Sequence, residues 1–186
     1  MTNIIAPKVL VVLADGFEEI EALAPIDLLR RAGLDVTTAS IDKADVLGSH
    51  NVSVKADVLL ADVMNNIYDM VVLPGGGLGT ENLSKSPLVA QLVYEQEQSK
   101  RYLAAICAAP TVLNKQGVFD KNILTSHPSV QSSFNQARYR TDSVVVSDKV
   151  ITSRGAGTAV EFALKLVETL CDKATADNVA QAIVYK

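Results

Sequence analysis

Residues 103–111, LAAICAAPT, run from an apolar stretch through a single cysteine and small residues into a sequence typical of a helix. This order predicts a β-strand, a sharp turn that carries Cys107, and a helix with Pro110 at its start. A thiol on such a corner points out of the sheet and lies near a helix N-terminus, where backbone N–H groups favour the thiolate. We therefore expect the pKa of Cys107 to lie well below that of an ordinary cysteine. A buried structural cysteine fits the motif as well.

The same order of strand and helix recurs on both sides of Cys107. Short β-rich apolar runs predict strands, and apolar residues at helical spacing predict the helices between them. The expected strands are 8–14, 35–40, 70–73, 102–106, 144–147 and 150–153, with a small hairpin or edge strand within 52–60. The expected helices are 18–32, 87–98, 110–116, 158–170 and 174–184. This alternation predicts one α/β domain over residues 1–186, with an open, mostly parallel sheet and helices on both faces.

The composition narrows the class of protein. With 48% hydrophobic residues, the chain of 186 residues has enough apolar side chains for a proper core. Its net charge of −4 argues against nucleic acid as the main partner. The longest apolar runs are too short to cross a bilayer, and the first residues lack the features of a signal peptide. We therefore expect a cytoplasmic protein that does not associate with membranes.

Cysteine and histidine are rare in this chain. Cys107 and Cys171 are its two cysteines, and His50 and His127 are its two histidines. Two cysteines form neither a disulfide framework nor a structural zinc site, and two histidines do not provide a histidine-rich metal site, so we expect no bound metal. Cys171 follows the end of a predicted helix and is interpreted as a structural residue. His50 is interpreted as a surface residue.

Three loops that follow predicted strands carry chemically active groups: 15–21 (DGFEEIE), 74–77 (PGGG) and 107–109 (CAA). In an open α/β sheet, ligands bind beyond the carboxyl ends of the strands, and these loops meet there. We therefore expect a carboxylate, a glycine-rich turn and a cysteine to share a pocket. On the residues alone, the acids at 18, 19 and 21 are better explained as solvated residues that complement the helix dipole.

Five segments together resemble one known family. They are LADGFEEIEA (13–22), VVLPGGGLGTENL (71–83), AAICAAPTVL (104–113), SHPS (126–129) and TSRGAGTAVEFALKLVETL (152–170). In this order and spacing they resemble the DJ-1/ThiJ/PfpI superfamily, and most closely its DJ-1/YajL-type branch. The resemblance extends from Lys8 to about Tyr185. It implies a flavodoxin-like α/β sandwich, commonly a homodimer, with a reactive cysteine on the turn after a strand.

The resemblance also assigns roles to particular residues. Cys107 matches the family's reactive cysteine, and Glu21 matches the acid that hydrogen-bonds to its thiol. His127 matches a histidine of the pocket, and the amides of Gly76 and Ala108 match the pair that binds an oxyanion. For Glu21 this outweighs the interpretation as a solvated helix residue.

The chain departs from the family's patterns at several positions. Ala108 stands where the peptidase-like branch has a histidine, which weakens any mechanism built on an adjacent Cys–His pair. Ala156 replaces the proline common in the Arg-Gly-Pro-Gly motif, and this change could reshape the pocket wall. His50 stands where DJ-1 itself carries an arginine.

The resemblance implies cofactor-free conversion of methylglyoxal or glyoxal to a hydroxy acid, or the related repair of early glycation adducts on proteins or nucleotides. Addition of a thiolate to an aldehyde suits the groups present. The alternative is a redox-responsive stress protein or chaperone whose cysteine oxidises to sulfinic acid. A cysteine peptidase is a weaker hypothesis because no histidine follows Cys107.

Overall fold

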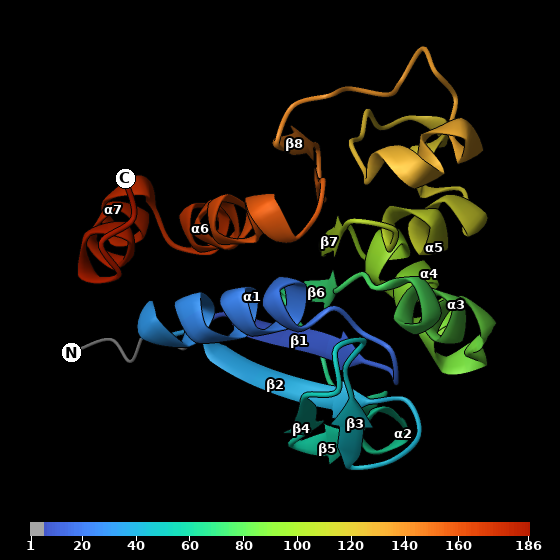
Figure 1. Ribbon diagram of the computed structural model, residues 1–186, viewed down its shortest axis with the longest axis horizontal. Coiled ribbons are helices and arrows are strands. Elements are labelled where there is room, and N and C mark those ends of the chain that lie inside the picture. Colours follow the sequence, from blue (N-terminus) through green and yellow to red (C-terminus); the bar gives the residue numbers. More distant parts are fainter. Residues whose placement is uncertain (1–5) are drawn as a thin grey trace.

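The chain folds into one large sheet with helices on both sides (Figure 1). The computed structural model describes residues 6–186. The strands are β1 (Lys8–Leu13), β2 (Asp35–Ser40), β3 (Asp45–Leu47), β4 (Ser53–Lys55), β5 (Val58–Leu59), β6 (Met70–Leu73), β7 (Tyr102–Ile106), β8 (Val144–Ser147) and β9 (Val150–Ser153). The α-helices are α1 (Glu19–Arg31), α2 (Leu60–Val63), α3 (Gly77–Lys85), α4 (Pro87–Gln98), α5 (Pro110–Lys115), α6 (Ala159–Leu170) and α7 (Lys173–Ala182). Short 3-10 helices are η1 (Val118–Asp120), η2 (Pro128–Ser133) and η3 (Ala156–Thr158).

The topology of the sheet places the loops that follow β1, β6 and β7 at one edge. Seven strands pair in the order β5-β2-β1-β6-β7-β9-β8, and β3 and β4 form a separate antiparallel hairpin. Within the large sheet all neighbours are parallel except β8 and β9. The strand order changes direction at β1, which lies between β2 and β6. Doubly wound sheets bind ligands beyond the carboxyl ends of their strands near such a switch point.

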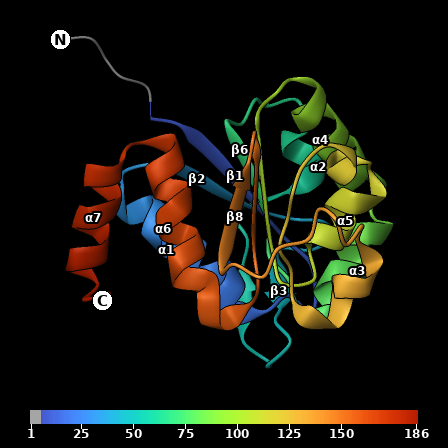
Figure 2. The same cartoon turned by 90° about the horizontal axis from the view of Figure 1, so that it is seen from above.

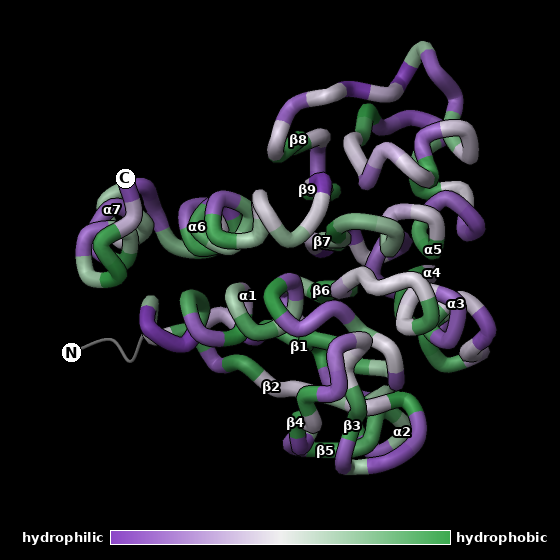
Figure 3. The backbone as a smooth tube through the Cα atoms, viewed as in Figure 1, coloured by the Kyte–Doolittle hydropathy of each residue, from purple (hydrophilic) through white to green (hydrophobic). Residues whose placement is uncertain are grey.

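Helices cover both faces of this sheet. In Figure 2, α1, α6 and α7 lie on one side of the strands, whereas α2, α3, α4 and α5 lie on the other. The central strands are almost entirely buried, with all of β6 and all but the first residue of β1 shielded from solvent. They are predominantly green in Figure 3, whereas α1 alternates between green and purple, as an amphipathic helix does. The predicted single α/β domain with helices on both faces is thereby confirmed.

The structure differs from the sequence prediction after the glycine turn and in the hairpin. The segment after the glycine turn is the helix α3, which its glycines disguise because glycine is a poor helix former. The hairpin expected within 52–60 pairs β4 with β3, and β3 lies outside that range. The edge strand expected within 52–60 is confirmed, because Val58–Leu59 pairs with β2 at the edge of the large sheet. Among residues 6–186, no helix has the length and apolar character needed to cross a membrane.

Candidate active site

Cys107 occupies the corner between β7 and α5. Its φ is 66°, in the left-handed region that residues with a side chain rarely adopt. Two backbone hydrogen bonds fix the corner: the Cys107 N–H donates to the Ser153 carbonyl at 3.0 Å, and the His127 N–H donates to the Cys107 carbonyl at 2.8 Å. The predicted strand, sharp turn and helix are confirmed. The strained corner presents a half-buried thiol at the carboxyl edge of the sheet.

Glu21 reaches the same point from the first turn of α1. It is only 1% exposed, and its carboxyl lies beside the Cys107 thiol. The Gly75 N–H donates to Glu21 Oε2 at 3.1 Å, and the Ala156 amide also favours the ionised carboxyl. Burial raises the pKa of Glu21 to about 7. Glu21 is thus a buried residue and not a solvated one, and its protonated and ionised forms are both populated near neutral pH.

The glycine turn after β6 packs closely against the loop after β1. Gly76 has a φ of 89°, and a Cβ there would lie 2.7 Å from the Glu18 nitrogen. The Glu18 N–H donates to the Gly75 carbonyl at 3.1 Å, which ties the two loops together. The amides of Gly76 and Ala108 lie close enough to the Cys107 sulfur to lower the pKa of its thiol. The structure thus brings together four of the five predicted site residues: Cys107, Glu21, Gly76 and Ala108.

The predicted direction of the Cys107 pKa is wrong. Burial raises the pKa of the thiol to about 12, and the negative charge of Glu21 adds to this effect. The Gly76 and Ala108 amides lower the pKa without offsetting burial. The helix contributes little because α5 begins only at Pro110 and is six residues long. Glu21 and Cys107 therefore titrate as a coupled pair. At pH values between about 7 and about 12, the two groups together hold one proton.

His127 lies beside this pair, and no hydrogen bond joins its ring to Cys107 or Glu21 among the described contacts. Its side chain is exposed and lies next to Gly155. A Cβ added to Gly155 would be in van der Waals contact with the ring carbon Cδ2, at 3.5 Å. The Ser129 N–H donates to His127 Nδ1 at 3.2 Å, so Nδ1 is the acceptor and Nε2 carries the proton of the neutral ring. His127 is therefore at the rim, and its ring is set up to donate from Nε2.

The profile of the DJ-1/PfpI family matches residues 7–169 of this chain. The chain belongs to the DJ-1/PfpI family. It is 44% identical to a protein of Drosophila melanogaster named Protein dj-1beta, over 94% of this chain and 95% of that protein. It is 41% identical to Glutathione-independent glyoxalase DJR-1.2 of Caenorhabditis elegans, over 82% of each chain. The solved structure of oxidized Toxoplasma gondii DJ-1 has a TM-score of 0.95 and 39% identity, and the match covers 97% of this chain and 99% of that one.

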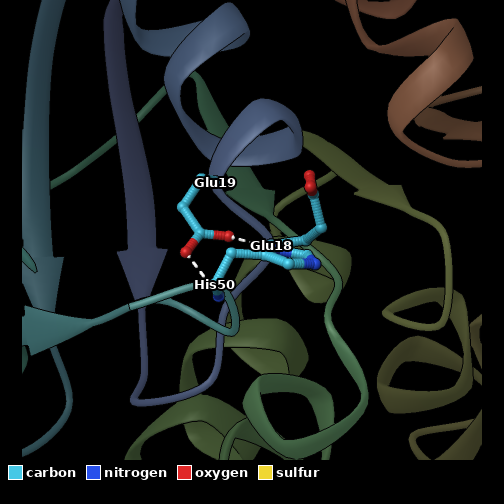
Figure 4. A group of neighbouring side chains, drawn as sticks. All are labelled: Glu18, Glu19 and His50. Atoms are coloured by element: carbon cyan, nitrogen blue, oxygen red, sulfur yellow. Dashed lines mark hydrogen bonds and ion pairs between the residues drawn. The ribbon is translucent and has the colours of Figure 1, made fainter. Parts of the chain in front are cut away.

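This DJ-1/PfpI chain buries a second acid, Glu19, in contrast to the solvated residue expected from the sequence. Glu19 Oε1 accepts from the His50 N–H at 2.7 Å, and Oε2 accepts from His50 Nδ1 at 2.9 Å (Figure 4). Ser49 and Val52 also donate to this carboxylate. A Cβ on Gly48 would lie 2.5 Å from the carboxylate carbon Cδ. Glu19 therefore fastens the loop of the β3–β4 hairpin to the start of α1.

The Glu19–His50 pair also explains two shifted pKa values. Hydrogen bonds from His50 lower the pKa of Glu19 to about 2 although burial acts in the opposite direction. The Glu19 carboxylate in turn raises the pKa of His50. Glu18, Glu19 and His50 lie close enough to be considered as metal ligands. The Glu19 oxygens already accept hydrogen bonds from the hairpin, so this cluster is accounted for by its structural role.

Cys171 departs from its predicted role, whereas Glu18 lies at the N-terminal end of α1 as expected. Cys171 is exposed immediately after the last residue of α6, which does not fit the expected structural role. Glu18 is the N-cap of α1, where its Oε2 accepts from the Glu21 N–H at 2.8 Å. Its charge adds to the raised pKa of Glu21. The first turn of α1 thus both holds Glu21 and adjusts its protonation.

Proposed function

We propose that this protein is a cofactor-independent, cysteine-dependent glyoxalase that converts methylglyoxal or glyoxal to the corresponding 2-hydroxy acid. Early glycation adducts of proteins or nucleotides are related substrates of the same chemistry. The observation that carries the proposal is the contact between a thiol on a strained corner and a buried carboxyl whose pKa is near neutral. The name of the glyoxalase relative supports the same activity.

The first step forms a bond between the Cys107 sulfur and the aldehyde carbon of the substrate. Because the pKa of the thiol is high, the Glu21 carboxylate removes its proton as the sulfur attacks. The electron pair of the carbonyl moves to its oxygen, where the amides of Gly76 and Ala108 stabilise the developing charge. Protonation of that oxygen by Glu21 gives a hemithioacetal.

The second step moves hydrogen between the two substrate carbons. Glu21, again ionised, removes the proton from the carbon bound to sulfur, and an enediolate forms with its negative charge on the oxygen of the neighbouring carbon. Glu21 returns the proton to the neighbouring carbon, and the hydroxyl proton of the first carbon passes to the second oxygen, which gives a thioester of the 2-hydroxy acid. Water then cleaves the thioester, which releases the acid and restores the thiol. One carbon is oxidised and its neighbour reduced, so the balance requires water and no external oxidant.

His127 is the second candidate for proton transfer. In the tautomer fixed by Ser129, its Nε2–H donates a hydrogen bond, and a substrate carbonyl at the rim is a suitable acceptor. We assign the base to Glu21, which touches the thiol, and assign His127 to polarising the second carbonyl. A His127→Phe variant is expected to lose turnover less severely than Glu21→Gln.

Glyoxalase assays of the wild type, Cys107→Ala and Cys171→Ser test this proposal. Removal of the nucleophile is expected to lower turnover by about 1,000-fold or more, and Cys171→Ser is the matched control that keeps it. Glu21→Gln keeps the shape of the side chain and is expected to lose roughly 100-fold or more. Deglycase assays on glycated substrates need a parallel measurement with methylglyoxal alone. Glyoxal turnover that survives in Cys107→Ala would overturn the proposal.

The second candidate function is a redox-responsive stress protein or chaperone. The structure of the Toxoplasma gondii relative is described as oxidized, which supports reactive cysteine chemistry in the family. A protonated Glu21 is placed to donate a hydrogen bond to a Cys107 sulfinate. Stoichiometric addition of two oxygens to Cys107, together with a change in holdase activity and without glyoxal turnover, would favour this function.

We also propose that the protein forms a homodimer. A groove of about 610 Å³ between α1 and the α6–α7 pair is lined largely by apolar side chains, among them Ile20 and Leu23. Ile20 is 53% exposed and Leu23 is 39% exposed, which is unusual for residues of this type on one helix face. A mass of a single chain in sedimentation at micromolar concentration would contradict the proposal.

A further inference from the structure

A small cavity lies at the opposite end of β7 from Cys107. Its volume is about 280 Å³, and it is lined by residues next to the starts of β7 and β9. Four cationic residues from three segments line it, together with two acidic residues. The cations are Lys100, Arg101, Lys121 and Lys149, and the carboxylates are Glu97 and Asp148. The cavity thus has an excess of positive charge in a chain of net charge −4.

Two of these cations are held in place by their neighbours. Arg101 Nε donates to Gln96 Oε1 at 3.1 Å, and Gln96 is itself only 2% exposed. Gln96 Nε2 donates in turn to the carbonyls of Tyr68 and Tyr102, which fixes the amide. Lys149 Nζ lies 4.1 Å from the centre of the Tyr102 ring. Arg101 is therefore positioned before any ligand arrives, which lowers the entropic cost of binding, whereas Lys149 has to leave the Tyr102 ring to reach one.

The four cations have no carboxylate partner among the ion pairs of residues 6–186. By contrast, the lysines that line the cavity beside β1 and β2 do have carboxylate partners. Lys43 pairs with Asp15 at 2.7 Å. Lys85, which also lines that second cavity, pairs with Glu81 at 2.5 Å.

The C-terminal end of α4 offers a simpler explanation for some of this charge. Its dipole attracts cations, which accounts for Lys100 and Arg101. It does not account for Lys121, which follows η1, or for Lys149, which lies in the β8–β9 turn. Convergence of unpaired cations from separate segments stores repulsion that an anion would relieve.

We propose that this cavity binds the phosphate group of a small phosphate monoester. Arginine presents a planar fork that matches phosphate oxygens, and lysines add point charges around it. The volume suits one small molecule, and the acidic chain has no basic stripe to follow a nucleic acid backbone. The site is distinct from the thiol site, because the five residues of β7 separate the two by roughly 17 Å.

Titrations of the full chain with inorganic phosphate and with glycerol 3-phosphate, at constant ionic strength, test this site. Amide NMR signals of Arg101, Leu103 and Lys149 are expected to shift saturably with a Kd of about 1 mM or tighter, while glycerol gives no shift. The variant Arg101→Gln/Lys149→Gln is expected to weaken binding by roughly tenfold or more. The matched control Lys43→Gln/Lys85→Gln changes the net charge equally at the other cavity and is expected to bind as the wild type does.

The side chain of Lys121 has no described hydrogen bond, so Lys121→Gln provides a mild second variant if the double variant does not fold. It is expected to weaken phosphate binding by roughly threefold. Absence of saturable shifts in the wild type would overturn the proposal. Equal weakening in the two double variants would also overturn it, because diffuse charge would then explain the binding. Glyoxalase turnover without phosphate is a separate readout and is expected to be unchanged in every lysine variant.

Discussion

Glu21 and Cys107 contact each other beside Gly75, and the contact depends on the missing side chain of that glycine. A Cβ on Gly75 would lie 2.6 Å from the Cβ of Cys107 and would overlap the Glu21 carboxylate. The Gly75 N–H also donates to Glu21 Oε2 at 3.1 Å. One glycine therefore both orients the carboxyl and leaves room for the thiol.

Gly75→Ala is expected to separate the thiol from the carboxyl and lower glyoxalase turnover by about 100-fold, since small displacements of reacting groups have large effects on rate. Gly77→Ala is the matched control, because a Cβ there meets no atom within 4 Å. Steady-state kinetics and thermal denaturation of both variants provide the comparison. Normal turnover in a folded Gly75→Ala protein would show that the close contact is not needed.

The charge of Glu21 is one cause of the high pKa of Cys107, so its removal is expected to lower that pKa. Glu21→Gln keeps a side chain of similar shape and takes away the like charge. Iodoacetamide alkylation rates across pH, in a Cys171→Ser background, report the titration of the remaining thiol. Glu161→Gln, an exposed acid on α6, is the control that should leave the titration unchanged. A wild-type thiol that titrates at or below about 8.5 would contradict the assignment.

The raised pKa of Glu21 also predicts how stability changes with pH. The folded chain binds the Glu21 proton up to about pH 7, whereas the unfolded chain releases it near 4.5. This contribution to stability is therefore complete below 4.5 and is lost as the pH rises through 7. The free energy of unfolding of Glu21→Gln, relative to that of the wild type, is expected to increase by about 3 kcal/mol between pH 4 and pH 8. Urea unfolding of the two proteins at both pH values measures this difference, and a constant difference would contradict it.

Most of the fold was predictable because its signals are local. The strand runs 35–40, 70–73 and 102–106 are short, apolar or β-branched, and bounded by polar or glycine turns, and the structure keeps those bounds. The corner at Cys107 could be predicted from the order of strand, small residues and Pro110. Helix α3 could not, because its packing against the loop after β1 overrides the low helix propensity of its glycines.

The chemistry of the site was less predictable than its position. The partnership of Glu21 with Cys107 came from the family resemblance, since an acid in a first helical turn has a simpler explanation. The direction of the thiol pKa depends on burial and on a charge from a distant segment, and neither is visible locally. The burial of Glu19 depends in the same way on the hairpin loop that closes over it. Such contacts join segments that no sequence periodicity connects.

The Glu19 carboxylate is expected to be the main fastening of the β3–β4 hairpin. Glu19→Ala leaves the His50 and Val52 amides without their acceptor and is expected to lower the free energy of unfolding by about 2 kcal/mol. The control variant Glu81→Ala removes an exposed ion pair within a helix. It is expected to change the free energy of unfolding by less than about 0.5 kcal/mol. Hydrogen exchange of the amides in residues 48–52 is expected to accelerate only in Glu19→Ala. Unchanged exchange there would show that the hairpin is held by other contacts.

Ala156 has a backbone N–H near Glu21 that a proline at this position would lack. This N–H favours the ionised carboxyl and lowers the pKa of Glu21, against the stronger effect of burial. Ala156 is the first residue of η3 and follows Gly155 in an extended conformation, with φ 164° and ψ −170°. Proline is tolerated at the first position of a helix and after an extended residue, so Ala156→Pro removes the donor with little other change.

Ala156→Pro is therefore expected to raise the pKa of Glu21 above about 7. Because the proposed mechanism requires the ionised carboxylate, the acidic limb of the pH–rate profile is expected to move to higher pH by roughly half a unit to one unit. Turnover at pH 7 falls accordingly and recovers at pH 9. Gly157→Ala is the control, since a Cβ there meets no atom within 4 Å. A pH–rate profile of Ala156→Pro that overlays that of the wild type would show that the Ala156 amide does not affect the pKa of Glu21. Loss of activity at every pH would indicate a displaced pocket wall instead.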